Sequence, residues 1–229
     1  MHQIICRGTL EGNSKIGFGT EIIENGKTIG KLETTTSSLQ QIMLSDKKFG
    51  VLKPKNGLYF TYKILSVDTE LTHKKVHKAV ANALNRWHFP LKFDFKRAKD
   101  GEAVDITIQF SSEAEDPILN SSTLAYMYYP LGGITNGKMV INTRFFWTLD
   151  GNAVNMHFID PIHYPDVTTA PIQGLSHDLD MVMAHEFGHG ILGLQHFFEG
   201  LMAYRYDLMV EFITTTDITR GSQKIPKRN

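Results

Sequence analysis

The sequence predicts an α+β fold, and three observations carry that prediction. Several short runs between residues 57 and 142 alternate apolar and polar residues, as strands that bury one face do. Two longer stretches, 70–87 and 176–194, instead space their apolar residues as an amphipathic helix does. With 229 residues the chain is long enough for one ordinary domain and an appendage. We therefore expect a sheet packed on helices, preceded by a small β-rich segment.

The composition is that of a globular protein without a charge bias. Hydrophobic residues make up 41% and charged residues 21%, and 24 Lys and Arg balance 24 Asp and Glu. A balanced chain has no general electrostatic attraction to nucleic acid or to an anionic membrane. We expect neither as a partner, and the oligomeric state stays open.

The sequence leaves the cellular compartment undecided. No apolar run approaches the ~20 residues of a membrane-spanning helix, and the start of the chain lacks the basic and apolar regions of a signal peptide. The single cysteine, Cys6, has no partner for an internal disulfide. Use inside a cell, in a virion or after non-classical export is compatible with these features.

Residues 1–55 read as a β-rich N-terminal segment. Its extended runs are separated by turn residues, among them Asn25-Gly26, a dipeptide typical of tight hairpins. A polar stretch, 34–38, could serve as a linker. The segment is either a small β-module or a pro-segment of unknown role.

The remainder, 56–229, is expected to form the main domain. The helix over 70–87 places one apolar stripe toward the core, namely Val76, Val80, Ala83, Leu84 and Trp87. The runs 58–65 and 104–110 alternate as strands do, and 91–95 is expected to be a short strand.

The helix over 176–194 is expected to begin with acids, Asp178 and Asp180, in its first turn, where they favour the helix dipole. Its core-facing stripe comprises Leu179, Val182, Met183 and Phe187, so its histidines should face elsewhere. Thr214 and the residues after it have the capping chemistry of a final helix.

The long connection 149–175 holds four closely spaced potential metal ligands, which are His157, Asp160, His163 and Asp166. A second metal site is conceivable there. Three prolines in the same stretch prevent a helix from aligning these side chains, so we expect a polar loop.

The motif with the clearest chemistry begins at His185 and has the pattern H-E-x-x-H. His185 and His189 are one helical turn apart on the same face, so two imidazoles can bind one zinc ion. Glu186 lies beside them and can act as general base toward a zinc-held water. Gly193 can end the helix, and the returning chain can supply His196 as a third ligand.

This motif resembles that of the metzincin metallopeptidases, and within them the matrixins (the matrix metalloproteinase family), whose pattern is H-E-x-x-H-x-x-G-x-x-H. His185, Glu186 and His189 match it, and Phe187-Gly188 is also common in matrixins. One residue is inserted before Gly193. A π-bulge could absorb the insertion, or the helix could run one residue longer and the loop re-aim His196. Glu199 and Asp207 are alternative third ligands.

The resemblance covers residues 57–225 and implies further features. It implies a metzincin-like twisted five-stranded mixed sheet, parallel except for one antiparallel edge strand, and a single catalytic zinc. By the same resemblance, 124–130 would be the edge strand and 137–142 the last strand of the sheet. Substrate would bind along the edge strand at Leu124, Ala125 and Tyr126, and near Tyr206. Met202 would form the methionine turn below the zinc. Lys138 and Val140 stand where matrixins carry ligands of a structural zinc, so that site is not expected, and calcium is not expected either.

Matrixin pro-segments can use a cysteine as a temporary zinc ligand, but the residues around Cys6 do not match that family motif. We interpret Cys6 as a small apolar residue.

The function predicted from these features is that of a zinc-dependent endopeptidase. Glu186 would take a proton from the attacking water and return it to the leaving amine. A peptidoglycan peptidase would use the same chemistry on another substrate. A degenerate protein that binds zinc without turnover is the alternative of another class, motivated by the residue inserted before Gly193.

Overall fold

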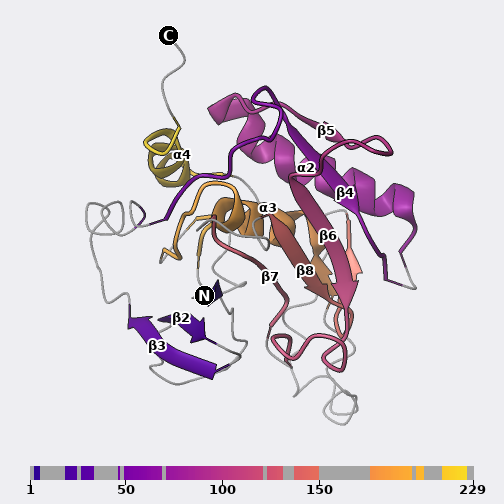
Figure 1. Cartoon of the computed structure of the whole chain (residues 1–229), viewed down its shortest axis with the longest axis vertical. Coiled ribbons are helices and arrows are strands. Elements are labelled where there is room, and N and C mark those ends of the chain that lie inside the picture. Colours follow the sequence, from indigo (N-terminus) through magenta and orange to yellow (C-terminus); the bar gives the residue numbers. More distant parts are fainter. Residues whose placement is uncertain are drawn as a thin grey trace, which may run out of the picture.

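A five-stranded sheet with two helices on one face forms the centre of the molecule (Figure 1). The structure is a computed structural model. It describes residues 3–5, 19–24, 27–33, 46, 49–68, 71–120, 123–130, 137–149, 176–197, 200–203 and 213–225. Within these ranges, no helix is long and apolar enough to cross a membrane.

The sheet has the strand order β5-β4-β6-β8-β7. Its strands are β4 (Phe60–Ile64), β5 (Phe95–Arg97), β6 (Ile106–Ser111), β7 (Ala125–Met127) and β8 (Lys138–Asn142). Neighbouring strands are parallel except for β7, which runs antiparallel to β8 at the edge. The expectation of a five-stranded mixed sheet with an antiparallel edge strand is confirmed.

Alternation along the strands divides the core between the two faces of the sheet. One face contributes every second residue to a large cluster shared with both central helices, for example Tyr62, Ile108 and Ile141. The opposite face forms a smaller cluster around Tyr126, Tyr128 and Val140. Both helices therefore cover the same face.

The helix α2 (His73–Leu91) begins after Thr72, whose hydroxyl accepts from the Lys75 backbone N–H. The predicted stripe is buried, and Trp87 donates from Nε1 to the Ala184 carbonyl at 2.7 Å, on the helix that carries the histidine motif. The predicted end at residue 87 was wrong, because α2 continues through Pro90 and ends at Lys92, which is left-handed at φ 59°. The predicted strand 91–95 therefore starts only at Phe95.

The helix α3 (Leu179–Gly190) is shorter than the predicted 176–194. Residues Ser176–Asp178 instead form β10, which pairs in parallel with β9 (Phe146–Thr148). The reason is that the Asp178 side chain caps the helix by accepting from the N–H groups of Asp180 and Met181, so Asp178 itself is extended. All twelve residues of α3 are buried, which corrects the expectation of a single core-facing stripe.

The helix α4 (Thr215–Ser222) starts with the predicted capping chemistry. Thr214 and Asp217 form a reciprocal capping box. Asp217 is fully buried and also accepts from the backbone N–H groups of Leu201 at 2.9 Å and Met202 at 3.4 Å. One carboxylate thus joins the start of α4 to the chain that follows α3.

In the N-terminal region, β1 (Gln3–Ile5), β2 (Gly19–Glu24) and β3 (Lys27–Glu33) form an antiparallel sheet in that order. The boundary at residue 55 and the role of this region stay predictions. Cys6 and the four potential ligands of the 149–175 connection lie outside the described residues.

Candidate metal centre and catalytic site

α3 holds His185 and His189 one turn apart on a helix that cannot turn freely, because it is buried all round. Their Nε2 atoms are 2.9 Å apart. α2 fixes the orientation of α3 through the Trp87 hydrogen bond and through an ion pair between Arg86 and Asp180 at 2.9 Å. The two imidazoles therefore converge because of helix geometry and helix packing together.

Backbone carbonyls set the protonation of both rings. Nδ1 of His185 lies 2.7 Å from the Leu201 carbonyl, and Nδ1 of His189 lies 2.5 Å from the Leu194 carbonyl. A carbonyl can only accept, so each Nδ1 carries the proton and each neutral ring keeps its lone pair on Nε2. This is the tautomer that a metal ligand with a carbonyl partner adopts.

The inserted residue is accommodated in the turn after α3. The N–H of Leu194 bonds to the Gly188 carbonyl at 3.0 Å and that of Gly193 to the His189 carbonyl at 2.9 Å. Each of these two hydrogen bonds spans one residue more than the corresponding bond of a Schellman motif. Gly193 takes the left-handed conformation at φ 64°. Of the two routes left open by the sequence, re-aiming by the loop is therefore the one adopted, without a π-bulge in α3.

This wider turn brings His196 to the other two histidines. Its Nε2 lies 3.1 Å from Nε2 of His185, and one potential ligand atom from each of the three rings lies within 4.8 Å of the others. Tetrahedral ligands at about 2.1 Å from one zinc are about 3.4 Å apart. The two distances from Nε2 of His185 are therefore within about 0.5 Å of the spacing of a zinc donor set. The fallback ligands Glu199 and Asp207 lie outside the described residues.

Burial keeps the three imidazoles neutral. It lowers the pKa of His185 to about 4, against a small opposing effect of its hydrogen bond to the Leu201 carbonyl. Burial also lowers the pKa of His189 and His196, and the neighbouring His185 and the Arg220 guanidinium lower both further. Neutral nitrogen donors in a dry site are suited to a divalent cation.

Glu186 lies beside this cluster with one carboxylate oxygen uncommitted. It is 5% exposed, and its Oε2 has no hydrogen-bond partner among the described residues. Burial raises the pKa of Glu186 to about 8, although a hydrogen bond from the Met127 backbone lowers it in part. A cation in the histidine site would lower this pKa again and restore a carboxylate base.

Met202 packs against α3 at Gly188. A Cβ on Gly188 would collide with the Met202 sulfur and would lie 2.9 Å from Cζ2 of Trp87. Met202 itself is fully buried. Met202 thus packs on the helix that carries the two histidines, and its place below the metal stays a prediction. The predicted Tyr206 lies outside the described residues.

β7 reaches the site with one backbone edge unpaired within the described sheet. The bonds from Tyr128 to Lys138 and from Asn142 to Leu124 show that its even-numbered residues bond to β8. The backbone groups of Ala125 and Met127 therefore point toward the other edge, where Met127 meets Glu186.

The two other residues predicted to bind substrate are placed less favourably. Leu124 and Tyr126 direct their backbone groups to β8. The Tyr126 side chain is fully buried, and its hydroxyl donates to Asp116 at 2.6 Å. The register of β7 therefore places no backbone group of Tyr126 on the free edge.

Three contacts of the site could not be found from the motif. The Leu201 and Leu194 carbonyls orient the helix histidines, and Tyr129, which is 2% exposed, places its hydroxyl 3.1 Å from Nδ1 of His189. Backbone groups carry no side-chain signature. Tyr129 lies 60 positions before its partner and resembles any aromatic residue of an edge strand.

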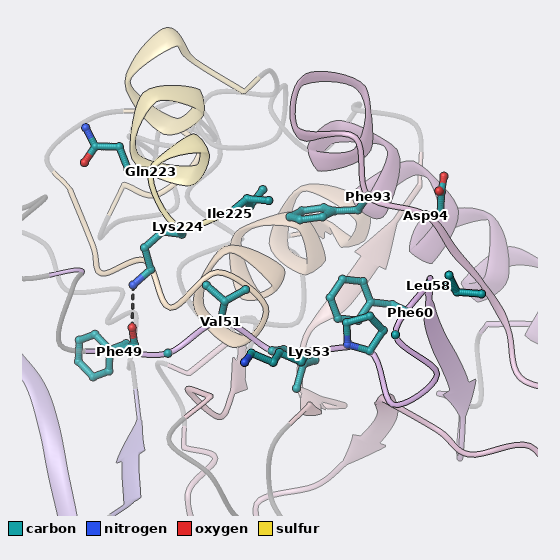
Figure 2. Close-up of a pocket in the computed structure, with 14 residues that line it drawn as sticks. Phe49, Val51, Lys53, Leu58, Phe60, Phe93, Asp94, Gln223, Lys224 and Ile225 are labelled. Carbon is teal, nitrogen blue, oxygen red and sulfur yellow. Dashed lines mark hydrogen bonds between the residues drawn. The ribbon is translucent and has the colours of Figure 1, made fainter. Parts of the chain in front are cut away.

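A separate cavity of about 720 Å³ lies beside the segment 49–54 (Figure 2). Phe60, Phe93 and Ile225 give it a largely apolar wall. None of the three clustered histidines lines it, nor does Glu186. The cavity is therefore distinct from the candidate metal centre.

A helix with H-E-x-x-H, a third converging histidine and a mixed sheet with an antiparallel edge strand together define a metallopeptidase fold of the metzincin class. The sequence model of the family described as Matrixin matches residues 53–225. The chain therefore belongs to the matrixin family, a family of zinc metalloproteases. It is also similar to matrilysin of Mus musculus, with 28% identity over 178 residues. That match covers 74% of this chain and 58% of the relative.

Proposed function

We propose that this protein is a zinc-dependent endopeptidase in which His185, His189 and His196 hold the metal and Glu186 is the general base. Membership of the matrixin family supports protease activity on a protein or peptide. The observation that carries the assignment of residues is the convergence of three Nε2 atoms, two of them on rings whose Nδ1 is committed to a carbonyl. The degenerate alternative assumes that the residue inserted before Gly193 keeps His196 away from the other two histidines, and this convergence argues against that assumption.

Zinc bound there would acidify a coordinated water and polarise the scissile carbonyl. The protein's own side chains contribute the proton transfer. The uncommitted Oε2 of Glu186 can accept a proton from the attacking water and return it to the leaving amine. The bond from the Met127 N–H restrains the carboxyl in one orientation, which limits the movement of the base.

The substrate would bind as an extended peptide along β7. The N–H and C=O of Ala125 point to the free edge, where a peptide can add as a further strand. Ala125 lies two residues from Met127, whose N–H holds the base. Pairing at Ala125 would therefore bring a peptide bond close to Glu186.

The test compares wild type, Glu186→Gln and His196→Ala for zinc content and casein hydrolysis. Glu186→Gln keeps the shape but cannot take the proton, so zinc should stay while turnover falls by about 10²-fold or more. His196→Ala should lose both zinc and turnover. Zinc without casein hydrolysis in wild type would favour the degenerate alternative, and full turnover in Glu186→Gln would refute the role of the base.

A further inference from the structure

A short stretch before the main domain lies against the histidine site. We call Asp46 and residues 49–54 the N-terminal strap. We propose that the strap is a positioning element for the metal site, with Asp46 as the residue that holds the His196 loop in place. This inference rests on the proposed function, because it concerns the same metal site.

Asp46 is the first attachment point. It is 2% exposed, and its Oδ1 accepts from the backbone N–H of Gln195 at 2.8 Å. Gln195 directly precedes His196. A carboxylate from a distant part of the chain therefore fixes the peptide unit between Leu194 and Gln195, directly before the third histidine, in the loop that the inserted residue has lengthened.

Arg220 on α4 completes this attachment. It donates from Nε and Nη2 to Asp46, at 2.8 and 3.0 Å, and from Nη2 to the Gln195 carbonyl at 2.6 Å. Gln195 is thus held through both its N–H and its C=O. The Arg220 side chain is 0% exposed, so Asp46 also neutralises a buried positive charge next to a site that must accept a dication.

The strap reaches the second histidine through an aromatic pair. Phe49 stacks on Tyr129 with ring centroids 4.3 Å apart. Tyr129 contacts His189 through its hydroxyl at 3.1 Å and through a tilted ring contact at 5.4 Å. This path does not use the Asp46 carboxylate, although the Phe49 N–H bonds to the Asp46 carbonyl at 3.1 Å, and it ends on a different imidazole.

Further contacts hold the strap against the turn after α3 and against α4. The N–H of Leu52 donates to the Ile191 carbonyl at 2.8 Å. Lys224 donates from Nζ to the carbonyls of Asp46 and Phe49, the latter at 2.7 Å (Figure 2). The strap is therefore bound on two sides, and a movement of it would be transmitted to the His196 loop.

The experiment measures zinc affinity by chelator competition on the full chain. Asp46→Asn keeps the shape but removes the charge, and Asp105→Asn is the matched control. Asp105 is also a buried carboxylate that accepts backbone N–H bonds, from Thr61 and from Lys55, which directly follows the strap, but within the described part of the chain it makes no hydrogen bond to Asp46, Phe49 or the histidine loop. Circular dichroism reports folding, and casein hydrolysis is followed on the same samples.

We expect Asp46→Asn to bind zinc about 10-fold more weakly than wild type, with Asp105→Asn within about twofold of wild type. Excess zinc should restore much of the casein hydrolysis of Asp46→Asn. If Asp46→Asn does not fold, Phe49→Leu is measured in its place. It disrupts the contact of Phe49 with Tyr129 and should weaken zinc binding several-fold.

The proposal is overturned if folded Asp46→Asn, or Phe49→Leu in its place, binds zinc as tightly as Asp105→Asn does. Failure of the proposed function would look different, because wild type itself would then lack zinc or casein hydrolysis.

Discussion

Gly193→Ala tests whether the widened turn after α3 depends on this glycine. Gly193 has φ 64°, and a Cβ there would lie 2.8 Å from Cβ of Phe49 and still closer to the Gly50 carbonyl oxygen. Alanine would therefore introduce both backbone strain and a collision with the N-terminal strap.

The two effects can be separated in size. A left-handed conformation costs a residue with a Cβ about 1–2 kcal/mol. Forcing an extra carbon into a filled space costs about 1–3 kcal/mol more. The sum, about 2–5 kcal/mol, corresponds to a decrease in Tm of roughly 4–20 °C for a chain of this size.

Gly101→Ala is the matched control. Gly101 has φ 78°, but a Cβ there would have nothing within 4 Å, so it carries only the backbone cost. Thermal unfolding of both variants, followed by circular dichroism in the absence of zinc, isolates the collision. A decrease in Tm for Gly193→Ala no larger than for Gly101→Ala would refute the packing of the turn against the strap.

Two further predictions concern zinc and pH. Zinc at 100 times its Kd should stabilise wild type by about 2.7 kcal/mol, which raises Tm by roughly 5–11 °C, and His196→Ala should lose most of that increase in the same scan. Burial and the neighbouring Asp180 raise the pKa of Asp178 from 3.8 to about 7. The folded state thus keeps a proton that the unfolded state has lost, so this stabilisation is complete below about pH 4 and lost as pH rises through about 7. Asp178→Asn cannot titrate but still caps α3, so urea unfolding should show wild type losing stability relative to it over this window, and parallel pH profiles would contradict the assignment.

The sequence correctly predicted the helices and strands whose apolar residues recur with the regular spacing of a helix or a strand. The α2 stripe from Val76 to Trp87 is buried as its spacing required, and the strand alternation yields the sheet. The two helix histidines were also predictable, because their spacing alone places them on one face. In these cases the determining interactions lie within a few residues of each other.

Predictions failed where distant contacts decide the local structure. α2 continues through Pro90 to Leu91, whose buried side chain lies against Gly221 of α4, in a stretch that reads as a strand. β10 forms because it pairs with β9, about 30 residues earlier, and the residue pattern of 176–178 does not predict this pairing. Asp46 lies 149 positions from Gln195, and nothing in its neighbourhood marks it as a partner of the site.

The complete burial of α3 has a consequence for metal exchange. Hydrogen bonds of an element enclosed on all sides open only with a large part of the fold, so His185 and His189 stay in place on the timescale of turnover. His196 is only half-buried and lies on a loop. If zinc binds here as proposed, the rate at which it leaves or a competing cation enters would therefore be set by the motion of this loop, while the two helix histidines stay fixed.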